Sequence, residues 1–257
     1  MERELAYRAV LAVDIERSAG RGDPALLAIR EALLTTLRAS LEQSGIDWDA
    51  CRVDDLGDGL RVVAPPGVRK AALVHPLFEE VAARLRAHNR LAGPATAIRV
   101  RMALHAGDVW LGPSGETAGR PLEVLARMLD APVVRTALAE APPSTVAALV
   151  LSQHFHEETV AHGYPGTEPE AFREVLVQAK EFTARAWLRL AGPAAGSVPG
   201  PASPGAGSVP EAEPRDAQPS PRPRTSGPSR MTNTASGNGV IYATQDGDQH
   251  ITIHGRS

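Results

Sequence analysis

The sequence lacks the features that mark disulfide-rich, membrane-spanning or strongly charged proteins. Its one cysteine, Cys51, excludes an intramolecular disulfide framework. It has no run of 18 apolar residues that could span a membrane, and its first residues lack the basic and apolar regions of a signal peptide. The 27 Lys and Arg residues nearly balance the 30 Asp and Glu residues, so no charge excess favours nucleic acid or an anionic membrane as a partner. We therefore expect a cytoplasmic protein.

The composition changes abruptly near residue 192, which predicts three segments. Residues 192–231 are rich in Pro, Gly, Ser and Ala and cannot bury enough apolar surface to offset the entropy of ordering, so we expect a disordered linker after a domain over residues 1–191. In residues 232–257 two short alternating runs flank Asp246 and Gly247, a pattern typical of a β-hairpin. Because a lone hairpin is marginally stable, we predict that this tail docks on a protein partner.

Strand and helix patterns alternate through the first domain. We predict helices over 24–44, 75–89, 121–130 and 153–162, and strands over 7–13, 51–55, 60–64, 98–104, 108–111, 147–151, 174–178 and 185–190. The first elements follow the order βαββαβ. That order predicts an α+β fold with a ferredoxin-like sheet, additional strands, and helices on one face.

Two aspartates lie where such a sheet could bring them together. Asp14 ends the first predicted strand, and Asp58 lies in the turn between the next two, flanked by Gly57 and Gly59. If the first strand lies beside that hairpin, both carboxylates meet at one end of the sheet. Such a pair can hold Mg²⁺, which takes oxygen ligands and bridges substrate phosphates. Taken singly, each is more simply a strand-end or turn aspartate.

The surroundings of these aspartates resemble the motifs of class III nucleotidyl cyclases. The resemblance is carried by Leu11–Ser18 (LAVDIERS), Asp55–Leu60 (DLGDGL), Ile98–Val109 (IRVRMALHAGDV) and Gly119–Met128 (GRPLEVLARM), and it continues through Leu149–Ser152 to Trp187. It covers about residues 5–190 in the family's order. It implies the palm fold of these cyclases and an enzyme that converts an NTP to a 3′,5′-cyclic nucleotide and pyrophosphate.

The resemblance also implies roles for individual residues. Asp14 and Asp58 match the two metal-binding aspartates, which implies Mg²⁺ or Mn²⁺ as the cofactor. Arg127 matches the arginine that stabilises charge on the transferring phosphoryl group, a task that suits a rigid guanidinium. Family members act as head-to-tail homodimers, with the metal from one subunit and the arginine from the other. The backbone of four further residues would hold the triphosphate: Ile15, Glu16, Arg17 and Ser18.

Among the positions that depart from the family pattern, three concern recognition of the nucleotide. Glu123 stands where the family has the asparagine that orients the ribose, and a carboxylate there is unfavourable beside a triphosphate. Asp54 and Glu116 fall near the two base-reading positions, and Asp54 cannot replace the lysine of an adenylyl cyclase. Two alternatives follow: an active cyclase with altered base recognition, or a catalytically degenerate domain that binds a nucleotide or a partner as a regulatory module.

Overall fold

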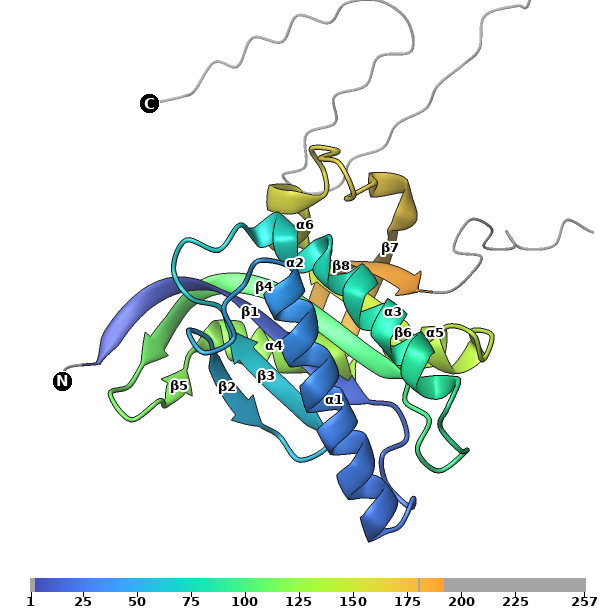
Figure 1. The fold of residues 1–257 in the computed structure, drawn as a ribbon. Coiled ribbons are helices and arrows are strands. Elements are labelled where there is room, and N and C mark those ends of the chain that lie inside the picture. Colours follow the sequence, from blue (N-terminus) through green and yellow to red (C-terminus); the bar gives the residue numbers. More distant parts are fainter. Residues whose placement is uncertain (1–2, 180, 192–257) are drawn as a thin grey trace, which may run out of the picture. The chain divides into compact units, whose positions relative to one another are not determined.

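The computed structural model describes residues 3–179 and 181–191 (Figure 1). The predicted linker (192–231) and hairpin tail (232–257) lie outside these residues. Among the helices of the described part, none is both long and apolar enough to cross a membrane.

A mixed eight-stranded sheet forms the centre of the domain. Its strand order is β2-β3-β1-β4-β6-β8-β7, and the short β5 pairs with β4. The β4–β6 pair is parallel and the neighbouring pairs are antiparallel. The strands are β1 (Glu4–Ile15), β2 (Arg52–Asp55), β3 (Gly59–Val63), β4 (Val100–Leu111), β5 (Thr117–Ala118), β6 (Ala147–Ser152), β7 (Arg173–Ala179) and β8 (Phe182–Ala191).

Helices cover both faces of the sheet, so the prediction that they share one face is wrong. In β1, Leu11 and Val13 enter one hydrophobic core, while Val10 and Ala12 enter a second core on the opposite face. A strand that is apolar at consecutive positions is buried on both sides. The first face carries α1 (Asp23–Gln43), α2 (Lys70–Val74), α3 (Leu77–Asn89) and α6 (Gln153–Thr159); the second carries α4 (Arg120–Asp130) and α5 (Pro132–Glu140) (Figure 1).

Several predicted boundaries also differ from the structure. The strands predicted over 98–104 and 108–111 form one continuous strand, β4. The helix predicted over 75–89 begins later, as α3, because Pro76 precedes it, and the separate short helix α2 lies before that proline. The helix α5 was not predicted, since only a few apolar residues mark its buried side. A 3₁₀ turn (Pro169–Ala171) leads into β7.

Candidate active site

The pairing of β1 with the β2–β3 hairpin brings Asp14 and Asp58 to the same end of the sheet. Asp14 lies opposite Gly59 in the ladder, and the amide of Ile15 donates to the carbonyl of Asp58 at 3.0 Å. The close approach depends on glycine, because a Cβ at residue 59 would lie 2.3 Å from the carbonyl oxygen of Val13. The backbone pairing thus places the two aspartates at one end of the sheet, as their strand-end and turn positions predict.

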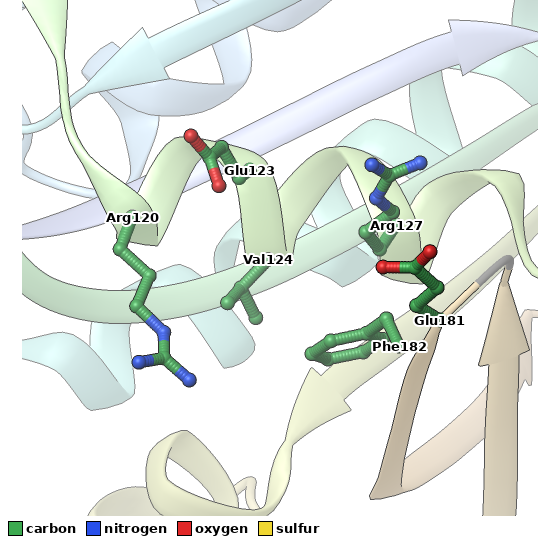
Figure 2. A pocket seen from close by; sticks show the side chains of 6 residues that line it. All are labelled: Arg120, Glu123, Val124, Arg127, Glu181 and Phe182. Atoms are coloured by element: carbon green, nitrogen blue, oxygen red, sulfur yellow. The ribbon is translucent and has the colours of Figure 1, made fainter.

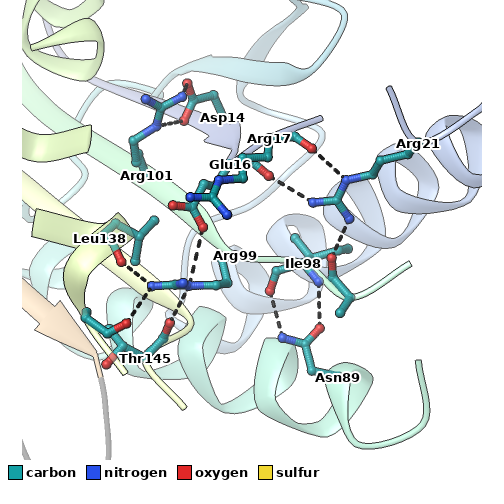
Figure 3. A network of polar contacts seen from close by, with 12 residues as sticks. Asp14, Glu16, Arg17, Arg21, Asn89, Ile98, Arg99, Arg101, Leu138 and Thr145 are labelled. Carbon is teal, nitrogen blue, oxygen red and sulfur yellow. Dashed lines mark hydrogen bonds and ion pairs between the residues drawn. The ribbon is translucent and has the colours of Figure 1, made fainter. Parts of the chain in front are cut away.

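Arg101, which sequence reasoning did not single out, holds Asp14 in a two-pronged ion pair (Figure 3). Its Nε lies 2.8 Å from Oδ1 of Asp14 and its Nη2 lies 2.5 Å from Oδ2. The two side chains are only 10% and 13% exposed. Burial raises the pKa of Asp14 to about 6, and Arg101 opposes that rise. The signal for Arg101 was available: an arginine inside an apolar strand requires a buried partner.

The turn after β1 carries the four residues predicted to hold a triphosphate. The amides of Ile15 and Glu16 already donate to backbone carbonyls, at 3.0 and 2.8 Å. Arg17 takes a left-handed conformation with φ of 52°, and the hydroxyl of Ser18 donates to Oδ2 of Asp58 at 2.9 Å. The turn therefore contacts the carboxylate of Asp58 through Ser18. Its contact with a triphosphate stays a prediction.

The two carboxylates supply the type of ligand that a divalent ion needs. Within the described residues, no group of three or more His, Cys, Asp or Glu side chains is placed to hold a metal. Mg²⁺ usually takes one or two carboxylates and completes its shell with substrate phosphates and water. Asp14 and Asp58 would supply two carboxylates to such a site, and in this structure Arg101 pairs with both oxygens of Asp14.

The two predicted base-reading positions also lie near each other. Oδ2 of Asp54 accepts hydrogen bonds from Nε and Nη2 of Arg61, at 3.0 and 2.8 Å, and from the hydroxyl of Thr117 at 3.0 Å. Glu116 directly precedes Thr117, and its Oε2 accepts the amide of Ser114 at 3.0 Å. Positions 54 and 116 are therefore joined through the β5 strand. Sequence reasoning missed Arg61 and Thr117.

The helix α4 directs Glu123 and Arg127 away from the core. Its apolar residues Leu122, Leu125 and Leu129 are buried, so Glu123 is exposed and Arg127 is half-buried. Both side chains line an open hollow of about 610 Å³ (Figure 2). The other lining residues are Arg120, Val124, Glu181 and Phe182, and neither predicted metal-binding aspartate is among them.

Comparison with known proteins supports the fold. No protein-family model matches the chain, and no curated protein matches it by sequence. An adenylate/guanylate cyclase/hydrolase from Silicibacter pomeroyi is 19% identical with a TM-score of 0.53, covering 73% of this chain and 98% of that one. The adenylyl cyclase CyaB from P. aeruginosa is 16% identical with a TM-score of 0.52, covering 73% and 95%. The catalytic core of a rhodopsin-guanylyl cyclase with converted specificity, in complex with ATPαS, is 14% identical with a TM-score of 0.50, covering 75% and 99%.

The described part of the chain therefore has the fold of the class III adenylyl and guanylyl cyclase domains. This confirms the predicted α+β cyclase palm. The low identities mark a divergent example of the fold, and a shared fold does not by itself imply a shared reaction.

Proposed function

We propose that this chain is a nucleotidyl cyclase that converts an NTP to a 3′,5′-cyclic nucleotide and pyrophosphate. It uses Mg²⁺ or Mn²⁺ and works in the cytoplasm as a head-to-tail homodimer. The observation that carries the proposal is the convergence of Asp14 and Asp58 at one end of a sheet with the cyclase fold.

Four charged residues of the site have a task in the proposed reaction. The 3′-hydroxyl of the ribose attacks the α-phosphorus, the bond to pyrophosphate breaks, and the hydroxyl proton passes to solvent. A divalent ion bound by Asp14 and Asp58 would neutralise phosphate charge and make the hydroxyl more acidic. If a divalent ion took the place of Arg101 on Asp14, the guanidinium of Arg101 would be free to bind a phosphate oxygen. Arg127 stabilises the negative charge that develops on the transferring phosphoryl group.

In the proposed dimer, Arg127 of one subunit would act on a substrate held by the aspartates of the other. Arg127 and Glu123 line the hollow on α4, whereas Asp14 and Asp58 belong to the β1 and hairpin end of the sheet and do not line it. A second copy, placed head to tail, would set the hollow of one subunit opposite the carboxylates of the other. If a two-fold axis relates the two copies, the dimer contains two equivalent sites.

The test is a product assay with each of the four NTPs. Purified protein is incubated with Mn²⁺ and each NTP, and cyclic product is measured by mass spectrometry. Asp58→Asn should abolish product. Asp55→Asn is the matched control, because Asp55 lies in the same hairpin but is exposed and pairs with Arg30. Absence of product from every NTP at high enzyme concentration would reject the proposal.

Two observations favour a second candidate, a degenerate domain that binds a nucleotide or partner without turnover. Arg101 occupies both oxygens of Asp14, and Glu123 replaces the ribose-orienting asparagine. This candidate predicts that Asp14→Ala and Asp58→Ala leave cellular function intact. Loss of function in both variants would count against it.

A further inference from the structure

Arg21 forms four hydrogen bonds to backbone carbonyls around the turn after β1 (Figure 3). Its Nε donates to the carbonyl of Arg17 at 2.7 Å, and its Nη2 donates to the carbonyl of Glu16 at 2.9 Å. Its Nη1 donates to the carbonyls of Ala95 and Ala97, at 3.2 and 2.6 Å, in the segment that precedes β4. The guanidinium therefore joins the turn to a segment that lies 74 to 76 residues further along the chain.

These contacts determine which way the peptide groups of the turn point. In a trans peptide the carbonyl of one residue and the amide of the next residue point in opposite directions. Because the carbonyls of Glu16 and Arg17 both point at Arg21, the amides of Arg17 and Ser18 point away from it. Neither amide has a hydrogen-bond partner among the described residues. The turn therefore offers two neighbouring free donors on the side opposite Arg21.

The free donors belong to the same end of the sheet as the carboxylate of Asp58. The hydroxyl of Ser18 donates to Oδ2 of Asp58 at 2.9 Å, so the residue that carries one free amide also contacts the proposed metal ligand. Successive backbone amides in a turn form concavities that bind anions. A phosphate chain that shares a divalent ion with Asp58 would bring its oxygens to these amides.

Arg21 acts on this anion site through the turn and not as a phosphate ligand. A guanidinium has five N–H donors, and those of Arg21 already make four hydrogen bonds to carbonyls. The residue that Arg21 holds is in a disfavoured conformation. Arg17 has a φ of 52° and is the one non-glycine residue of the described part with a positive φ. The hydrogen bond from Arg21 to its carbonyl stabilises that conformation.

We infer that Arg21 is a positioning residue that presents the amides of Arg17 and Ser18 to the phosphate oxygens of the substrate. The inference rests on the proposed function, since it concerns the polyphosphate of that substrate. It assigns to Arg21 a role that follows from its four carbonyl contacts. Without those contacts the two amides lose their fixed direction, although the metal-binding aspartates stay in place.

The experiment measures polyphosphate binding separately from metal binding. Full-length protein is titrated by calorimetry with Mn²⁺ alone and then with the Mn²⁺ complex of inorganic triphosphate. Arg21→Met should weaken triphosphate binding by roughly 10- to 150-fold, the equivalent of one hydrogen bond to a charged group, and leave the affinity for Mn²⁺ unchanged. In the product assay KM should rise more than kcat falls, because the turn holds the phosphates in the ground state as well as in the transition state.

Two further variants distinguish positioning from charge and from a loss of stability. Arg21→Lys keeps the charge but lacks the planar fork that reaches carbonyls on two sides, so it should lose part of the triphosphate affinity. Full affinity in Arg21→Lys would show that charge alone matters and would overturn the inference. If Arg21→Met does not fold in a thermal-unfolding control, Arg21→Lys decides the point.

Arg189→Met is the matched control for stability. The side chain of Arg189 is also enclosed, at 15% exposure, but it contacts Glu79 and the ring of Phe78. Its removal should lower the unfolding temperature and leave triphosphate affinity unchanged. An equal loss of triphosphate affinity in Arg189→Met and Arg21→Met would reduce the effect to general destabilisation and overturn the inference.

The outcomes separate this inference from the proposed function. Cyclic product from the wild type, together with wild-type triphosphate affinity in Arg21→Met, overturns the inference and leaves the cyclase. Triphosphate binding that depends on Arg21, without cyclic product from any NTP, supports the inference and rejects the cyclase. Absence of triphosphate binding by the wild type overturns the inference, and the product assay then decides the cyclase alone.

Discussion

Replacing Arg101 by methionine tests how the carboxylate of Asp14 is held in the absence of metal. The substitution keeps an unbranched apolar stem and removes the guanidinium that contacts both oxygens of Asp14. Removing one partner of a buried ion pair typically costs about 3–5 kcal/mol, because the other charge is left uncompensated. Asp14 can limit this cost by binding a proton, so the cost must depend on pH.

The sign of that dependence follows from the pKa of Asp14. Burial already raises the pKa to about 6 with Arg101 present, and without Arg101 it must rise further. A carboxyl whose folded pKa lies above its unfolded value destabilises the fold as pH rises from the unfolded pKa to the folded one. Wild type stops losing stability near pH 6, whereas the variant continues at up to about 1.4 kcal/mol per pH unit. The difference in unfolding free energy should therefore grow above pH 6.

Urea denaturation at pH 5 and pH 8, with and without Mn²⁺, measures the effect. We expect Arg101→Met to be destabilised by about 2–4 kcal/mol at pH 8 and by much less at pH 5. Mn²⁺ should stabilise the variant more than wild type, because the ion binds the freed carboxylate only in the folded state. Arg38→Met serves as the surface control. An equal loss of stability at both pH values, with no response to Mn²⁺, would refute the reasoning.

Two further predictions concern the sheet around the site. Burial lowers the pKa of His105 to about 4, so the folded protein holds this side chain neutral. The free energy of unfolding should therefore fall by on the order of 1–3 kcal/mol as pH decreases from about 6.5 to about 4. Urea denaturation at pH 7.5, 5.5 and 4 should show that His105→Gln lacks this pH-dependent loss of unfolding free energy. Parallel curves of unfolding free energy against pH for variant and wild type would contradict the prediction. Gly59→Ala should cost about 1–3 kcal/mol and weaken Mn²⁺ binding measured by calorimetry, because its Cβ meets the β1 backbone. Gly93→Ala, whose Cβ meets nothing within 4 Å, is the control, and equal Mn²⁺ affinities in the two glycine variants would disprove the argument.

The fold was largely predictable because local signals and the motif series agreed. The apolar run of β1, the turn at Asp58 and the stripe on α4 each marked an element correctly. The prediction of helices on one face failed although β1 itself held the correct signal, since Val10 and Leu11 are both buried. The helix α5 was missed because its short apolar stripe is indistinguishable from a loop until the sheet beneath it is known.

The candidate site was predictable only in part. The positions of Asp14 and Asp58 follow from a strand end and a turn. The ion pair of Asp14 with Arg101 joins residues 87 apart in the sequence and depends on the register of β1 against β4. The same holds for Asp54 with Thr117, which are 63 residues apart. A single sequence does not specify such registers, because many alignments of two apolar strands bury similar surface.

The measurement that tests the central claim most directly is complementation between two inactive subunits. Asp58→Asn removes a carboxylate of one half-site, and Arg127→Met removes the arginine of the other. We expect neither variant alone to form cyclic nucleotide. A 1:1 mixture should regain about a quarter of wild-type activity, since half of the dimers are mixed and each mixed dimer has one intact site. A mixture that stays inactive beside an active wild type, or an active single variant, would contradict a cyclase built from two half-sites.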